Sequence, residues 1–288
     1  MHPSRFILHQ PTTVQEALEL KERYGDSATF YSGGTELLIA LKARVLHYEH
    51  VIDVKRVSEL STVCLHDDRG ILSIGARCTH HALAHDPLVR EHLPGYAELS
   101  DQVANIRVRV AGSVGGVLCF GEPHADAPTM LCALDAQIVL IGPQGERRVP
   151  SRDFHLGEFS TAREEDELMV AIEVPQQSRG TRSAYRCFRP TERPAAGVAA
   201  VWSTDGAQRL SLWAGALSSA PVRLAGSEEA ASQISPDAPP QAVWEALHAT
   251  VAADAEGIEA YDDLHGSADY KRHLITVLAR RAIDASLP

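Results

Sequence analysis

The sequence lacks the cysteine pairs that usually hold metal clusters. No two of its five cysteines form a Cys-x-x-Cys motif, and they lie far apart, at Cys64, Cys78, Cys119, Cys132 and Cys187. An odd, scattered set indicates reduced thiols, and it argues against an iron–sulfur or zinc site built from these cysteines alone. We therefore expect no metal site in this chain and a reducing, cytoplasmic location.

A long apolar run and an excess of basic charge are also missing. No apolar stretch approaches the ~20 residues that a membrane helix needs, and residues 1–6 lack the basic-then-apolar build of a secretion signal. The 288-residue chain has a net charge of −11 and no basic amphipathic stretch. Because nucleic-acid and membrane-surface binding rest on positive charge, we expect neither nucleic-acid binding nor membrane insertion. Small molecules and proteins remain as partners.

The first 55 residues carry the pattern of a small parallel sheet. Thr13 and Glu16 form the signature of a capping box in front of a helix with an apolar side. Residues 28–32 and 50–54 have the composition of buried strands, and residues 35–42 between them are helix formers. A strand–helix–strand unit of this kind predicts parallel strands.

From about residue 60 the pattern becomes antiparallel. Asp68-Arg-Gly70 and Gly142-Pro-Gln-Gly145 each separate two short apolar runs and predict hairpins. A further strand over residues 168–174 stops at Pro175. The polar residues 176–181 then predict a linker, where we place the domain boundary.

The expected fold class is α+β, with two domains. The first domain covers residues 1–176, with subdomains of about 1–55 and 56–176, and the second covers residues 177–288. In the second, apolar runs over residues 195–203 and 208–216 flank Thr204-Asp-Gly206 and predict another hairpin. Helical patterns follow at residues 228–233, 241–253 and 268–285. The tail is thus predicted to be an antiparallel sheet with helices.

Two glycine pairs stand where a backbone could approach a phosphate. Tyr31-Ser-Gly-Gly-Thr-Glu-Leu-Leu38 runs from a predicted strand into a predicted helix, and Gly112-Ser-Val-Gly-Gly-Val117 repeats the glycine pair. Paired glycines let backbone N–H groups come close to a phosphate, and Thr35 adds a hydroxyl at the expected capping position. A single loop of this kind is usually a plain connector. Two of them predict a pyrophosphate held from both sides.

Neither common nucleotide-binding motif fits these loops. Asp53 ends a strand 19 residues after Gly34, near the spacing of a ribose-binding carboxylate in a Rossmann fold. However, Gly-x-Gly-x-x-Gly is absent, and Glu36 and Leu38 stand where that fingerprint needs small residues. A P-loop motif is absent as well.

The loops and their surroundings resemble one known family. Three segments are similar to the FAD-binding medium subunit of molybdenum hydroxylases, the xanthine dehydrogenase and carbon monoxide dehydrogenase family: Phe30 to Leu38, Val103 to Gly116, and Pro123 to Ala136. Residues 72–80, 167–175 and 267–281 match in the same order. The resemblance therefore covers nearly the whole chain.

The resemblance implies a PCMH-type FAD-binding domain whose two subdomains hold the cofactor between them. It places around the pyrophosphate Ser32, Gly33, Gly34, Thr35, Glu36 and Leu37, and on the second side Gly112, Ser113, Gly115, Gly116 and Val117. It assigns Asp126 to the sugar region and puts Ala104, Met169 and Arg186 near the adenine or the flavin ring. A plain core position explains Met169 equally well.

The sequence also departs from the family pattern. Val117 stands where the family usually has Asn, so a polar contact to FAD is lost or supplied by another group. Thr35 stands where some covalent flavoproteins of the superfamily carry a flavin-linking His, which implies noncovalent FAD. A cysteine-rich insert found in one branch of the family is missing, as expected for a subunit that carries only flavin.

The resemblance implies an electron-transfer subunit. A molybdopterin-binding large subunit would oxidise the substrate, a small subunit with two-iron, two-sulfur clusters would relay the electrons, and FAD would pass them to NAD, a quinone or oxygen. Because the flavin carries the redox chemistry, no catalytic residue is expected here. The alternatives are a self-contained FAD-dependent reductase or oxidase of the same superfamily and a nonenzymatic dinucleotide-binding assembly module. We expect a turn from Asn105 to Val110, with Arg107 and Arg109, to face a partner.

Overall fold

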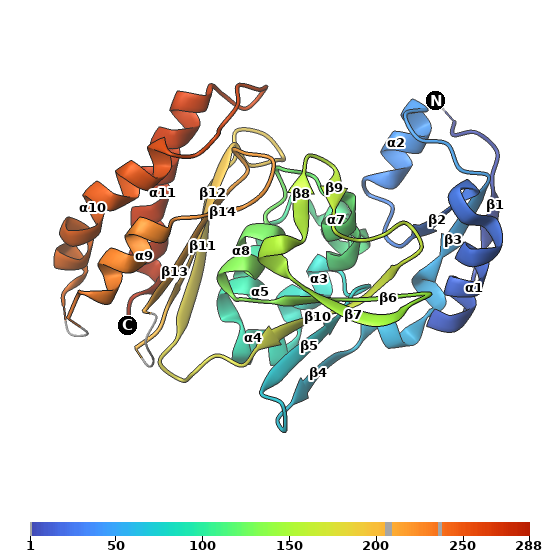
Figure 1. The fold of residues 1–288 in the computed structure, drawn as a ribbon, viewed down its shortest axis with the longest axis horizontal. Helices are drawn as coiled ribbons and strands as arrows, with labels where there is room; N and C mark the ends of the chain where they lie inside the picture. The colour runs from blue at the N-terminus through green and yellow to red at the C-terminus, as the bar shows by residue number, and fades with distance from the viewer. Residues whose placement is uncertain (1, 205–208, 236–237) are drawn as a thin grey trace.

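The computed structural model describes residues 2–204, 209–235 and 238–288. Three parts lie side by side in Figure 1: a small sheet with two helices near the N-terminus, a mixed middle part, and a C-terminal sheet with long helices. The order of the parts in space follows their order in the chain. The middle part therefore contacts both of the others.

The first part is a parallel sheet, as predicted, and its strand order is β1-β3-β2, with β1 as an additional strand that was not predicted. Its strands are β1 (Ile7–His9), β2 (Ala28–Tyr31) and β3 (His50–Asp53), and its helices are α1 (Val14–Tyr24) and α2 (Leu37–Ala43). The Thr13 side chain caps α1 by accepting a hydrogen bond from the Glu16 N–H at 3.1 Å. The Glu16 carboxylate in turn accepts from the Thr12 N–H, one residue earlier than a standard capping box would have it.

One prediction for this part is wrong. Helix α2 begins one residue later than a Thr35 cap would place it, and Glu36 occupies the N-cap without a side-chain capping bond. Thr35 therefore belongs to a loop of residues 32–36 that joins β2 to α2. The longer loop leaves more backbone free of helical hydrogen bonds.

The middle part is built on a five-stranded antiparallel sheet in the order β4-β5-β10-β6-β7. Its strands are β4 (Val63–His66), β5 (Ile71–Gly75), β6 (Gln137–Gly142), β7 (Gly145–Pro150) and β10 (Leu168–Pro175). Both predicted hairpins are confirmed, and β10 pairs with β5 on one side and β6 on the other. A separate pair joins β8 (His155–Gly157) to β9 (Ser160–Thr161).

Short helices fill the chain between β5 and β6. They are α3 (His80–His85), α4 (Pro87–His92), α5 (Pro94–Gln102), α6 (Ile106–Ala111), α7 (Val114–Phe120) and α8 (Ala127–Ala133). Single 3₁₀ turns occur at Gly25–Ser27, Val54–Arg56, Ser58–Ser61 and Ser151–Asp153. The predicted turn from Asn105 to Val110 is mostly helix α6, which Asn105 caps by accepting hydrogen bonds from the N–H groups of Arg107 and Val108.

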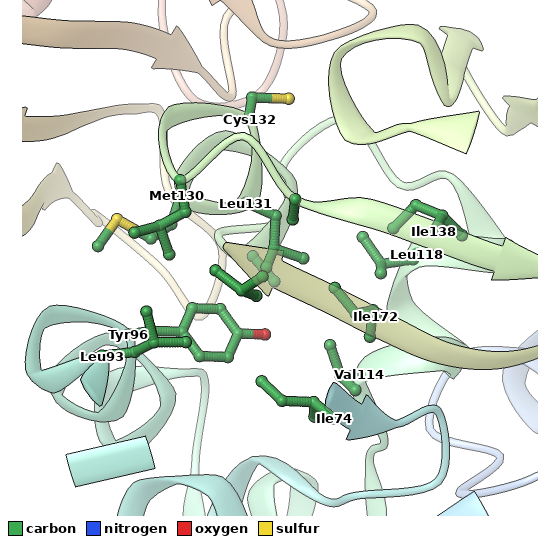
Figure 2. Packing of buried hydrophobic residues seen from close by; sticks show 14 of the residues in the cluster. Ile74, Leu93, Tyr96, Val114, Leu118, Met130, Leu131, Cys132, Ile138 and Ile172 are labelled. Carbon is green, nitrogen blue, oxygen red and sulfur yellow. The ribbon is translucent and has the colours of Figure 1, made fainter. Parts of the chain in front are cut away.

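The central core fixes α7 and α8 against the sheet. Figure 2 shows Ile74, Leu118, Leu131 and Ile172 pointing toward one another, with the Tyr96 ring beside them. These side chains are at most 1% exposed. Burying a side chain of this size contributes about 1.5–3 kcal/mol, so the core holds the start of α7, where the second glycine loop lies, in a fixed position.

The C-terminal part is an antiparallel sheet covered on both faces. It contains β11 (Arg182–Phe188), β12 (Ala196–Trp202), β13 (Leu210–Gly215) and β14 (Val222–Arg223), followed by α9 (Ala225–Ser232), α10 (Pro240–Glu256) and α11 (Ala268–Ser286). Along β12, Ala199 joins the central core while Val198 packs in a second cluster with the long helices. Those helices cover the outer face of the sheet in Figure 1. The predicted hairpin is confirmed in its antiparallel pairing, whereas Asp205, Gly206 and Gln208 of the prediction lie outside the described residues.

The α+β fold class is confirmed. The domain boundary at residue 176 stays a prediction, because the C-terminal sheet shares the central core with the middle part. Of the helices in the described ranges, none combines the length and the apolar character required to span a membrane.

Candidate functional site

A cavity of about 810 Å³ lies between the parallel sheet and the middle part. Sites for small molecules typically measure roughly 300–1,000 Å³. The first glycine loop and the end of β2 form one wall, and Ala76, Arg77 and the second glycine loop form the other. Leu168 and Met169 of β10 add an apolar surface.

The two glycine loops contact each other directly. The Ser113 hydroxyl donates a hydrogen bond to the Ser32 hydroxyl at 3.0 Å. A Cβ atom on Gly33 would collide with the carbonyl oxygen of Ala111, and one on Gly112 would lie 3.3 Å from the Thr35 hydroxyl oxygen. These glycines thus let the loops pack together, in addition to any role at a ligand.

The first loop presents unused backbone donors. Within the described part of the chain, the N–H groups of Gly33, Gly34 and Thr35 donate no hydrogen bond. Gly34 has a φ of +70°, and a Cβ there would meet the Tyr31 ring. Successive free N–H groups in a loop of this kind form a concave site for an anion.

Most N–H groups of the second loop donate hydrogen bonds within the protein. The N–H groups of Val114 and Gly115 donate to the carbonyls of Cys78 and Ala76, at 3.0 and 2.8 Å. The Gly116 N–H donates to the Ser113 hydroxyl at 3.2 Å. The matching glycine pairs predict two similar walls, but the walls differ. The first loop offers free N–H groups, whereas the second loop mainly forms part of the cavity surface.

Glu36, at the end of the first loop, is held by a cation from the C-terminal part. Arg193 donates to both oxygens of the Glu36 carboxylate and also pairs with Glu122. Burial raises the pKa of Glu36, and Arg193 only partly offsets this. Burial also acts to raise the pKa of Glu122, but hydrogen bonds from His124 and Arg193 outweigh it and hold that pKa at about 2.

The same chain of ion pairs continues away from the cavity. His124 contacts Glu122 through Nδ1 at 3.0 Å and Asp263 through Nε2 at 2.8 Å. Asp263 also accepts from Lys271 of α11, a lysine that is fully buried. His124 lies outside the cavity lining, so this arrangement favours a structural role over acid–base chemistry.

The structure brings most of the expected cofactor-binding residues together. The cavity is lined by Ser32, Gly33, Gly34, Thr35, Glu36, Leu37, Ser113, Gly115, Gly116 and Met169. Met169 is 3% exposed and belongs to the central core as well, so the two interpretations of this residue both apply.

The remaining expected residues lie outside the cavity lining. Val117 packs against the central core, and Gly112 is buried behind the first loop. Asp126 is buried and accepts a hydrogen bond from Arg189 at 2.8 Å, while the side chain of Arg186 donates to Glu98 at 3.1 Å. Ala104 has a φ of +40°, and its carbonyl accepts from Arg109. Roles in FAD binding for these five residues stay predictions.

Several residues of the lining were not predicted. Phe120 and Phe159 meet edge to face, with ring centroids 5.5 Å apart, and Arg77 stands two residues after β5 on the second wall. Arg77 lies inside the segment 72–80 that resembles the family, so its charge was a signal available in the sequence. Phe159 had no such signal, because only the fold brings the turn between β8 and β9 to the cavity.

Comparison with known proteins identifies the family. Residues 4–177 match the family described as FAD binding domain in molybdopterin dehydrogenase. The carbon monoxide dehydrogenase medium chain of Hydrogenophaga pseudoflava is 34% identical over 288 residues, covering 99% of this chain and 98% of the relative. A putative xanthine dehydrogenase FAD-binding subunit of Escherichia coli K12 is 27% identical over 285 residues, covering 97% and 95%.

Solved structures agree with this match over the whole length. Carbon monoxide dehydrogenase from Hydrogenophaga pseudoflava, in a form lacking the Mo-pyranopterin moiety, superimposes with a TM-score of 0.90 at 32% identity and covers 99% of this chain and 98% of that one. A cyanide-inactivated Cu,Mo-CO dehydrogenase gives a TM-score of 0.91 at 28% identity, covering 99% of each chain. The predicted resemblance and PCMH-type fold are thereby confirmed.

The site itself fits the cofactor named by the family. Free N–H groups line one wall, both loops carry glycines and so have no side chain at these positions, and an apolar surface lies along β10. The diphosphate of a dinucleotide can accept hydrogen bonds from the free N–H groups, and its flat rings can lie on the apolar surface. The chain belongs to the family of FAD-binding domains of molybdopterin dehydrogenases and is a flavoprotein subunit of an oxidoreductase.

Proposed function

We propose that this chain is the electron-transfer subunit of a molybdenum hydroxylase complex, taking electrons from an iron–sulfur subunit onto FAD and passing them to an external acceptor. The observation that carries the proposal is the cavity between the two glycine loops, with its unused N–H groups at Gly33, Gly34 and Thr35. Bound FAD supplies the redox chemistry, and the protein binds and orients it.

The residues of the cavity divide this binding task. The N–H groups of the first loop hold the diphosphate, and the Ser32–Ser113 hydrogen bond keeps the two loops at a fixed separation. Leu168 and Met169 exclude water from one side. Thr35 stands where some covalent flavoproteins of the superfamily carry a flavin-linking His, which supports noncovalent binding of the cofactor.

The proposed partner subunits carry the iron–sulfur clusters and the molybdopterin that this chain has no residues to hold. Its cysteines are all free and scattered, and five thiols cannot ligate the two iron–sulfur clusters that the electron path needs. We therefore assign the clusters to a small subunit and the molybdopterin to a large subunit. NAD, a quinone or oxygen is the acceptor, and free thiols favour the cytoplasm as the compartment.

Flavin reduction tests this proposal. The purified chain loaded with FAD is mixed anaerobically with organic substrates of molybdenum hydroxylases, alone and together with its co-purified partner chains, and flavin absorbance is followed. We expect a chemical reductant to bleach the flavin in both samples, and a substrate to bleach it only when the partners are present. Substrate-dependent reduction of the metal-free chain alone would contradict the proposal and favour a self-contained oxidoreductase.

A further inference from the structure

Arg77 stands on the wall of the cavity that carries the second glycine loop. It is the second residue after β5, and its own N–H donates to the Leu60 carbonyl at 2.7 Å. The neighbouring Ala76 carbonyl accepts from the Gly115 N–H at 2.8 Å. Arg77 therefore follows a residue that is hydrogen-bonded to the second loop, and it lines the cavity.

The Arg77 guanidinium has no partner in the part of the chain that the structure describes. Its Nε atom is buried without a hydrogen-bond acceptor, and no carboxylate lies within 4.0 Å of the group. The other cations of the lining are engaged. Lys21 donates to the carbonyls of Gly25 and Ala28, and Arg163 donates to three backbone carbonyls.

The acidic groups of the lining do not contact this charge. Glu36 pairs with Arg193 and Glu167 with Arg147. The other two acidic residues of the lining, Asp26 and Glu165, form no ion pair with Arg77. Arg77 is half-buried, and a buried polar atom without a partner, such as its Nε, costs free energy that a ligand anion can offset. No acidic group of the described lining thus neutralises Arg77 by direct contact.

We propose that Arg77 binds the diphosphate of FAD from the second wall, opposite the N–H groups of the first loop. This rests on the proposed function, in which the cavity takes FAD. The second loop has used its own N–H groups at Val114, Gly115 and Gly116 inside the protein, so a side-chain donor on this wall would complement the N–H groups of the first loop. A planar guanidinium fits two phosphate oxygens at once.

Ligands that share parts of FAD test the proposal. FAD, ADP and riboflavin are titrated calorimetrically against the FAD-depleted full chain, as wild type and as Arg77→Gln. We expect FAD and ADP to bind about 10- to 100-fold more weakly to the variant, the range for hydrogen bonds to charged groups. Riboflavin, which has no phosphate, should bind both proteins equally. Arg77→Lys should restore part of the ADP affinity, because lysine keeps the positive charge but cannot donate to two phosphate oxygens in the planar arrangement of a guanidinium.

Two controls separate contact with the ligand from support of the fold. Arg56→Gln changes an exposed arginine outside the cavity lining and should leave all three affinities unchanged. Without FAD, Arg77→Gln should melt at the wild-type temperature or above, since it removes an unpaired charge.

Each outcome decides the matter. Equal FAD and ADP affinities in wild type and Arg77→Gln overturn the assignment of Arg77 while leaving the proposed function intact. A lower melting temperature with parallel loss of riboflavin binding also overturns it, because Arg77 would then support the fold. A wild-type chain that binds no FAD overturns both the proposed function and this inference.

Discussion

Arg193 and Glu36 join the two ends of the molecule. The Arg193 guanidinium donates to the Glu36 carboxylate oxygens at 2.9 and 3.1 Å, across 157 residues of chain. Glu36 closes the first glycine loop, while Arg193 lies between β11 and β12. Because Arg193 also pairs with Glu122 after α7, one side chain connects all three parts of the fold beside the cavity.

Replacing this arginine should loosen the site. Arg193→Met leaves Glu36 and Glu122 without their shared cation. The pair is partly exposed, at 37% for Arg193 and 27% for Glu36, so we expect the free energy of unfolding to fall by only about 1 kcal/mol, together with weaker FAD binding. Urea unfolding and FAD titration measure both. Arg152→Met, which removes an exposed pair with Asp135, is the control and should change stability by less than about 0.5 kcal/mol; equal losses in the two variants would contradict the connecting role.

Two glycines with similar backbone angles separate strain from cofactor binding. Gly34 and Gly70 have φ values of +70° and +62°, so Gly→Ala should cost each about 1 kcal/mol of stability. A Cβ on Gly70 meets nothing within 4 Å, whereas one on Gly34 meets the Tyr31 ring inside the cavity. Gly34→Ala should therefore lose FAD, and Gly70→Ala should keep it. Retained stoichiometric FAD in Gly34→Ala would mean that the first loop does not hold the cofactor.

Stability should fall in mild acid because of buried histidines. Burial lowers the pKa of His155 to about 4, and burial together with the nearby Arg109 lowers that of His80 to about 4. The folded chain then binds fewer protons than the unfolded chain, whose histidines titrate near ~6.5. The stabilisation is complete above about pH 6.5 and is lost as the pH falls toward 4, by up to about 3 kcal/mol for each group.

His155→Leu tests this dependence. Neither ring nitrogen of His155 has a hydrogen-bond partner of good geometry in the described chain, so leucine removes the titrating group at the cost of only a weak contact with the Leu118 backbone. We expect a flatter plot of unfolding free energy against pH between 6.5 and 4 in denaturant titrations. The exposed His273→Leu should keep the wild-type slope. A wild-type slope in His155→Leu as well would rule out this histidine as a source.

The two arginines of α6 should behave differently. Arg107 is exposed, whereas Arg109 donates to the carbonyls of Val103 and Ala104 and holds the segment before the helix. Arg109→Glu should lower the free energy of unfolding by about 1–2 kcal/mol. Arg107→Glu should leave stability and FAD binding unchanged but weaken assembly with the partner chains, measured by co-purification. If Arg107→Glu assembles normally, this face of α6 is not the partner surface.

Local patterns made much of the site predictable. The glycine pairs are visible in the sequence because the residues that form each loop are adjacent, and both hairpins carry their own turn residues. The capping position of Thr35 was wrong because helix α2 starts only after Glu36, whose carboxylate pairs with Arg193 far along the chain.

Other features depend on contacts that no local pattern carries. Helices α3 to α8 are six to nine residues long, which is too short for a clear helical period, and β1 has only three residues. The asymmetry of the two glycine loops was also hidden, since it arises from Ala76 and Cys78 accepting the second loop's hydrogen bonds.

The flavin content of the purified chain tests the central claim most directly. The chain is saturated with FAD, freed of excess cofactor, and precipitated with acid, after which flavin is measured in the supernatant and in the pellet. We expect one FAD for each chain, all of it in the supernatant, because the cavity binds a single dinucleotide without a covalent bond. A chain that retains no flavin, or flavin that stays with the precipitated polypeptide, would contradict the account.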